Sequence, residues 1–260
     1  MRNSNSFPPG KFRHFWGGYL FLFDKSVPAT YPADSGIHLL VIVVLLEGLI
    51  RPALRSAIYG GSNIHLAWRG LALVATMLFL AIGLTHYWLC IPFSCLGLFR
   101  WRRWGRTEKW FFPQVMMIGL VVHASMQWTS LCRLPHQPAW MRATLVVLVQ
   151  QVSWGFYQEF VYRGLLQTEL VRRWGPASGI LVSNLLFTFG PLHMYHLGLG
   201  QNDPAHLLIF LAIFAIGLYF GVLYHTSQNL WMIGLLHGLG DFFIDGQPIL
   251  IGASVRAGFL

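Results

Sequence analysis

Apolar residues occur along this chain in long, nearly unbroken runs, and most polar residues lie between the runs. The runs cover residues 36–50, 71–99, 111–131, 142–170, 179–196, 205–224 and 230–244. A helix needs roughly 20 apolar residues to cross the hydrocarbon core of a bilayer, where it satisfies its own backbone hydrogen bonds. The runs do not alternate at every second residue, which argues against a porin-like β-barrel. The pattern predicts an all-α, polytopic transmembrane helical bundle with about seven spans, within limits of about six to eight.

The run 71–99 is too long for one upright helix and too short for two complete ones. Thr85, His86 and Pro92 interrupt it. We interpret it as a tilted or kinked span that ends near Pro92 and is followed by an interfacial piece. A helical hairpin is the alternative.

The composition agrees with a membrane environment. Hydrophobic residues make up 55% of the 260 residues and charged residues only 10%, whereas soluble domains carry about one quarter charged residues. The formal net charge of +9 could indicate nucleic acid, but Lys and Arg concentrate at the ends of the runs, where they meet anionic headgroups. No basic groove or recognition module is visible. We expect the lipid bilayer as a partner and no nucleic acid.

The chain divides into an interfacial or cytoplasmic segment (1–34), the early spans with a basic and aromatic loop (35–139), a catalytic core (140–245) and a tail (246–260). Residues 1–34 lack an apolar core followed by a cleavage site, so we do not interpret them as a cleavable signal peptide. The positive-inside rule places the N-terminus in the cytoplasm of a multi-pass protein of the inner or plasma membrane. A hairpin at 71–99 would change the orientation of everything after it.

Few acidic residues occur within the predicted spans, and each is costly in hydrocarbon unless it pairs or faces a wet cavity. Glu47 lies four residues before Arg51, and we interpret this pair as structural. Glu159 and Arg163 have the same spacing, which places an acid and a base on one helix face.

Two histidines complete this polar set. His237 lies four residues before Asp241, so the carboxylate can fix the imidazole tautomer. His193 follows Gly190-Pro191, a dipeptide that should kink the helix and open its backbone toward a cavity. Three late spans thus each bring a polar cluster toward the interior of the bundle. Any one of these three clusters, taken alone, could be structural. The convergence of all three indicates a functional site.

At these residues the chain resembles the CPBP intramembrane proteases, the group that includes the Rce1-type CAAX prenyl endopeptidases and bacteriocin-processing relatives. The family pattern is Glu-Glu-x-x-x-Arg, then Phe-x-x-x-His, then His-x-x-x-Asn/Asp on successive late helices. The matching positions are Gln158, Glu159 and Arg163, then Phe189 and His193, then His237 and Asp241. The resemblance extends over about residues 140–245.

The resemblance implies hydrolysis of a peptide bond in a membrane-anchored or lipidated protein tail, without a metal or another cofactor. It implies that a glutamate and His193 activate water, that His237 and Asp241 lie on the oxyanion side, and that Arg163 orients the acidic helix. A desolvated carboxylate suits a general base, and imidazole donors suit a developing negative charge.

The chain departs from the family pattern at its first catalytic position, where Gln158 replaces the usual glutamate. Glutamine can position a water molecule but cannot accept its proton. Either Glu159 does this work, or the chain is an inactive homologue that binds rather than cuts, or the amide is a deliberate replacement that traps substrate. Asp241 in place of the commoner Asn is a milder change.

Two other classes of function are open. In a metal-dependent hydrolase, Glu159, His193, His237 and Asp241 would be the ligands, since His and carboxylate suit zinc. No His-Glu-x-x-His helix is present to support this. A non-catalytic membrane binding protein, such as an immunity or scaffold component, is the alternative that Gln158 motivates. The sequence carries no signal for an oligomeric state.

Overall fold

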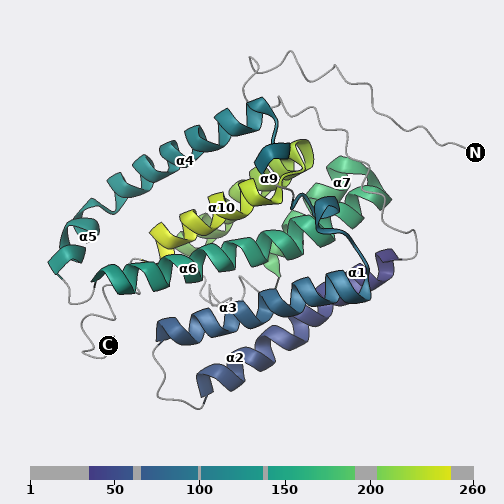
Figure 1. The fold of residues 1–260 in the computed structure, drawn as a ribbon, viewed down its shortest axis with the longest axis horizontal. Helices are drawn as coiled ribbons and strands as arrows, with labels where there is room; N and C mark the ends of the chain where they lie inside the picture. Colours follow the sequence, from purple (N-terminus) through teal and green to yellow (C-terminus); the bar gives the residue numbers. More distant parts are fainter. Residues whose placement is uncertain (1–34, 61–65, 99–100, 137–139, 191–203, 247–260) are drawn as a thin grey trace, which may run out of the picture.

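The computed structural model describes residues 35–60, 66–98, 101–136, 140–190 and 204–246. Every regular element in these ranges is a helix (Figure 1), so the expected all-α class is confirmed. The predictions for residues 1–34 and 247–260 lie outside the described residues. The four-part division of the chain stays a prediction.

The first helical rod consists of α1 (Ser35–Val44), the π-helix η1 (Leu45–Ile50) and α2 (Arg51–Gly60). The predicted run 36–50 lies within this rod, which continues beyond Arg51 and Pro52 to Gly60. The rod continues because Arg51 is neutralised inside the helix by Glu47, at 3.1 Å between Nε and Oε2. Pro52 is tolerated just after the π-helix, where the backbone already bonds with a longer spacing, from the Arg51 amide to the Leu46 carbonyl.

The second rod is α3 (Leu66–Gly83) extended by the π-helix η2 (Leu84–Trp88). A short 3₁₀ turn, η3 (Phe93–Leu96), follows Pro92. The run 71–99 is therefore one helix and an end piece, as expected, and not a hairpin. Two more 3₁₀ turns, η4 (Trp101–Arg103) and η5 (Leu134–His136), flank α4 (Arg106–Met126) and α5 (Trp128–Arg133).

The late part of the chain begins with the trunk formed by α6 (Trp140–Glu159), the π-helix η6 (Phe160–Gln167) and α7 (Thr168–Phe189). Gly175 interrupts α7 with φ 78° and ψ 169°, followed by Pro176. This left-handed φ suits a glycine, and it falls between the predicted runs 142–170 and 179–196. The bundle is completed by α9 (Pro204–Ser227), α10 (Leu230–Asp241) and the π-helix η7 (Phe242–Gly246).

Among the described residues, three helices are long and apolar enough to cross a membrane: Ile37–Ile58, Trp68–Trp88 and Leu207–Ser227. A shorter apolar helix covers Leu230–Ile244. These four correspond to the predicted runs 36–50, 71–99, 205–224 and 230–244. The other predicted spans, and hence the total of about seven, stay predictions.

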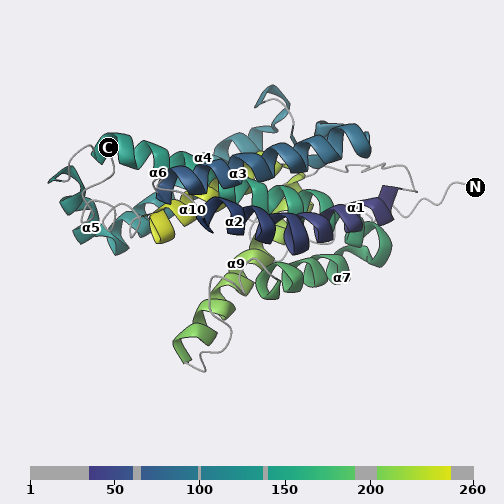
Figure 2. The ribbon, with the colours of Figure 1, turned by 90° about the horizontal axis from the view of Figure 1, so that it is seen from below.

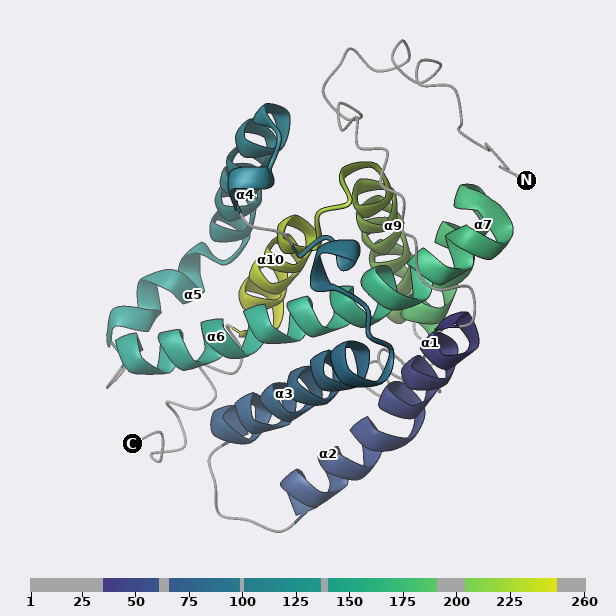
Figure 3. The same ribbon diagram turned by 45° about the vertical axis from the view of Figure 1, so that its right-hand side comes forward.

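The helix α6 lies at the centre of the bundle, between α3 and α10 (Figures 1 and 3). It meets α10 almost backbone to backbone, because a Cβ added to Gly238 would lie 2.4 Å from the Cα of Val152. In Figure 2, α7 and α9 lie on one side of the rest of the bundle, and one end of α9 projects away from it. The crossing of α6 and α10 brings together residues that are far apart in the sequence.

Candidate active site

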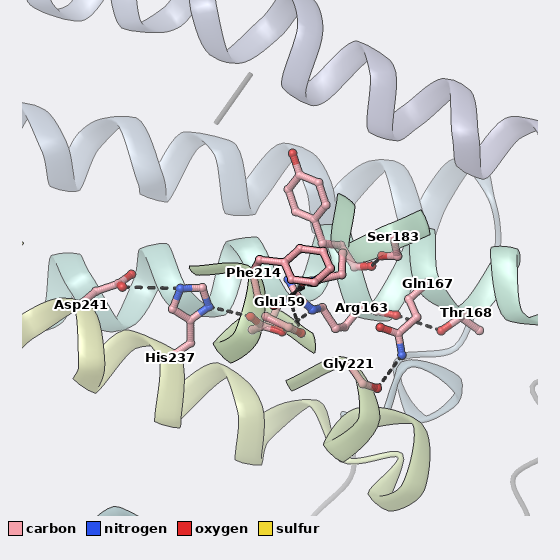
Figure 4. Close-up of polar contacts among 12 residues, drawn as sticks. Glu159, Arg163, Gln167, Thr168, Ser183, Phe214, Gly221, His237 and Asp241 are labelled. Carbon is pink, nitrogen blue, oxygen red and sulfur yellow. Dashed lines mark hydrogen bonds and ion pairs between the residues drawn. The ribbon is translucent and has the colours of Figure 1, made fainter. Parts of the chain in front are cut away.

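Glu159, at the end of α6, is the centre of a buried charged network (Figure 4). Its side chain has no exposed surface. One oxygen, Oε1, lies 2.6 Å from Nδ1 of His237 on α10, and the other, Oε2, lies 3.3 Å from Nε of Arg163. The carboxylate is therefore held from both sides, which offsets the cost of its burial.

His237 connects this carboxylate to a second one. Its other ring nitrogen, Nε2, lies 3.5 Å from Oδ1 of Asp241. The side chain of His237 is 12% exposed and that of Asp241 is 21% exposed, whereas Glu159 and Arg163 are inaccessible. An imidazole that meets a carboxylate at each nitrogen donates to both only when both nitrogens carry a proton. The network thus has a sealed end at Arg163 and an accessible end at His237 and Asp241.

Arg163 fastens the sealed end to two further helices. Its Nη2 donates to the carbonyl oxygen of Gly217 on α9 at 2.9 Å and to Oδ1 of Asn184 on α7 at 3.4 Å. Its guanidinium carbon lies 4.0 Å from the centre of the Phe187 ring. The predicted pair with Glu159 is confirmed, and it belongs to a junction of four helical segments.

Small residues on α9 make this junction possible. Gln167 donates from Nε2 to the carbonyl oxygen of Gly221 at 2.8 Å, one turn along from the Arg163 bond to Gly217. A Cβ added to Gly217 would lie 2.2 Å from Oδ1 of Asn184, and one added to Gly221 would lie 2.9 Å from Oε1 of Gln167. Glycine at both positions lets these polar side chains reach the α9 backbone.

Gln158 is buried next to Glu159, and its Oε1 has no hydrogen-bond partner. A buried amide oxygen without a partner costs stability unless another group, such as water or substrate, supplies a donor. Glu159 differs, because its Oε1 meets His237 and its Oε2, which also lacks a hydrogen-bond partner, forms an ion pair with Arg163. This contrast weighs against Glu159 as a replacement for the catalytic glutamate expected at position 158.

His193 lies outside the described residues, so its expected place at the site stays a prediction. The helix α7 ends at Phe189, and its C-cap Gly190 has the extended angles φ −77° and ψ 174°. Phe189, the other member of this motif, is 50% exposed and stacks on Phe210 of α9. Its ring therefore packs on α9 and serves the helix contact.

A second buried cluster, which sequence reasoning only half predicted, surrounds Glu47. The expected pair with Arg51 forms. In addition, the Tyr157 hydroxyl donates to Oε1 of Glu47 at 2.6 Å, and the Tyr162 hydroxyl donates to Oε2 at 3.4 Å. The Tyr162 ring also packs edge-on against Phe187. The only sequence signal for these tyrosines is that they flank Gln158-Glu159 on the same trunk.

Among the described residues, no group of three or more His, Cys, Asp and Glu side chains could hold a metal ion. The geometry explains why Glu159, His237 and Asp241 do not form one. The two carboxylates approach different nitrogens of the same imidazole. A single ion could not bind all three side chains in this arrangement.

Long apolar helices and a buried polar centre define an all-α integral membrane protein. Residues 139–243 match the family model described as Type II CAAX prenyl endopeptidase Rce1-like. This confirms the resemblance over the part of the chain that contains the whole Glu159 network, and it supports an intramembrane endopeptidase of the CPBP type in general. Comparisons with curated proteins and with solved structures gave no match.

Proposed function

We propose that this protein is an intramembrane endopeptidase that hydrolyses a peptide bond in a membrane-anchored or lipidated protein tail. The single observation that carries the proposal is the contact of 2.6 Å between His237 and Glu159. It joins two motifs of the family pattern, within the segment that matches the family model. A buried ionic junction in an apolar bundle is expensive, and such sites are usually functional.

In this proposal Glu159 and Arg163 position the reacting groups and do not react. Glu159 holds Nδ1 of His237, as second carboxylates do for catalytic imidazoles. Asp241 keeps the imidazole positively charged, so Nε2 donates a hydrogen bond to the oxyanion that forms when water attacks the scissile carbonyl. This role suits Asp241 better than direct donation, which a carboxylate cannot provide.

In this proposal Gln158 and His193 activate the attacking water. The free Oε1 of Gln158 accepts a hydrogen bond from the attacking water. The imidazole of His193 accepts the proton of that water and later returns it to the leaving amine. The carboxylates of this site do not act as the base, because Glu159 is engaged and Asp241 neutralises His237.

The test is cleavage of a lipidated, membrane-anchored peptide by the purified chain in liposomes. His193→Ala and His237→Ala should each lower the cleavage rate by a factor of about 10² or more. His225→Ala is the matched control, since this histidine lies at the end of α9 and should leave cleavage unchanged. Full activity in both site variants would refute the proposed roles.

Gln158 favours a second candidate, a homologue that binds membrane-anchored tails without cutting them. In that case Gln158→Glu should create cleavage, or raise it by about 10² to 10⁴, because a general base is restored. Efficient cleavage by the unchanged chain would eliminate this candidate. Binding of the peptide with no turnover would favour it.

A further inference from the structure

A group of exposed cations and tryptophans lies where α4 begins. We define the basic-aromatic surface as Trp101, Arg102, Arg103, Arg106 and Trp110, all of which are exposed. The two tryptophans are 52% and 65% exposed. Within the described part of the chain, the three arginines form no ion pair. Their charge is therefore available to a partner.

Two buried side chains hold this surface in place. Trp104 is buried in the main hydrophobic core and packs edge-on against Phe112. Glu108, one helical turn further, is 1% exposed and accepts a hydrogen bond from the Gly105 amide. Because Trp104 and Glu108 point inward, the neighbouring arginines and tryptophans point outward.

The same Glu108 also binds the helix that carries His237. Its Oε1 accepts a hydrogen bond from Nδ2 of Asn229 at 3.1 Å. Asn229 is the N-cap of α10, where its Oδ1 accepts from the Met232 amide at 3.3 Å. The next amide, that of Leu230, donates to the carbonyl oxygen of Gly97 at 3.2 Å. The start of α10 is therefore attached to the segment that presents the cations.

We propose that the basic-aromatic surface binds anionic phospholipid headgroups, and that Glu108 and Asn229 transmit this binding to the N-terminal end of α10. Arginine forks match the geometry of phosphate oxygens, and indoles settle at the depth of the headgroups. Apolar side chains further along α4, among them Met117, Ile118 and Val121, are also exposed and would face the acyl chains of such a lipid. An anionic lipid is the one occupant that satisfies the cations, the indoles and this apolar face together.

The first experiment measures lipid selectivity with spin-labelled phosphatidylglycerol and phosphatidylcholine on the reconstituted full chain. The unchanged protein should prefer phosphatidylglycerol, and the triple variant R102Q/R103Q/R106Q should lower this preference roughly fivefold or more. The control is R55Q/R133Q/R142Q, which removes the same charge from exposed arginines elsewhere and should keep the preference. No preference in the unchanged chain, or equal loss in both variants, would overturn the proposal. Binding of an oligonucleotide in place of lipid would also overturn it.

The second experiment measures amide hydrogen exchange in the first turn of α10, in nanodiscs with and without phosphatidylglycerol. The anionic lipid should slow this exchange severalfold in the unchanged chain and not in the arginine triple variant. Asn229→Ser, which keeps a capping oxygen for α10 but removes the amide that donates to Glu108, should keep the lipid preference but lose the exchange response. If the exchange rate in the unchanged chain is the same with and without phosphatidylglycerol, the coupling between the basic-aromatic surface and α10 is refuted. Neither experiment uses hydrolysis, so these results are independent of the proposed endopeptidase activity.

Discussion

Nδ1 of His237 lies 2.6 Å from Oε1 of Glu159, although 78 residues separate the two. The contact forms where α6 and α10 cross with almost no side chain between them. It extends to Asp241 at one end and Arg163 at the other, so acidic and basic side chains alternate along the network (Figure 4). Each buried side chain in this network is stabilised by the oppositely charged or hydrogen-bonding groups beside it. Replacing one of them should therefore lower the stability of the protein, which can be measured.

Glu159→Gln should lower the free energy of unfolding by about 3 to 5 kcal/mol, because Arg163 and His237 would then be buried without a shared counter-charge. Asp241→Asn, at the accessible end, should cost less than half as much. Reversible unfolding in mixed micelles measures both. Equal losses in the two variants would contradict a network with a sealed and an accessible end.

Tyr157→Phe should cost about 1.5 to 3 kcal/mol, since it removes a hydrogen bond of 2.6 Å to the buried carboxylate of Glu47. Tyr162→Phe is the matched control. Its hydroxyl lies 3.4 Å from the same carboxylate, so its loss should cost less than about 1 kcal/mol. The same unfolding assay compares the two, and a reversed order would show that Tyr157 does not carry the cluster.

Gly238→Ala should disrupt the crossing of α6 and α10, because its Cβ would lie 2.4 Å from a backbone atom that cannot move independently. We expect a loss of about 3 kcal/mol or more and a displaced His237. Gly240→Ala, on the same helix, meets nothing within 4 Å and should be neutral or stabilising by up to about 1 kcal/mol. Thermal unfolding of the two purified variants decides this. A harmless Gly238→Ala would disprove the close crossing.

Arg163→Lys should lower stability by about 2 kcal/mol or more, because an ammonium cannot reach Glu159, Gly217 and Asn184 at once. Arg172→Lys is the control on the same trunk. Arg172 pairs with Glu169 but is 34% exposed, and replacing it should change stability by less than about 1 kcal/mol. Chemical unfolding in detergent is the measurement. Similar effects at both positions would argue against the fork geometry at Arg163.

Local spacing predicted part of the site correctly. Pairs four residues apart, such as Glu159 with Arg163 and His237 with Asp241, follow from helix geometry alone. The helix break at Gly175-Pro176 follows from the conformational preferences of those two residues. The resemblance to the family pattern agrees with the match over residues 139–243.

Contacts between helices could not be predicted from the sequence. Nothing in the spacing of Glu159 and His237 tells that α10 packs on α6, nor that Tyr157 reaches Glu47. Such partners are set by tertiary packing, which a single sequence does not display. The place of His193 stays a prediction.

The π-helix η6 begins directly after Glu159 and runs to Gln167. A π-helical turn bonds from each residue to the fifth one before it, so it accommodates one residue more than an α-helical turn. Deleting a single residue within η6 would let the trunk revert to α-helix and keep the helix beyond it in register, whereas a reversion without a deletion would rotate everything beyond η6 by about 100°. Asn184 and Phe187 would then face away from Arg163. Relatives with an α-helical trunk should therefore align to this chain with a one-residue gap between the acidic pair and α7.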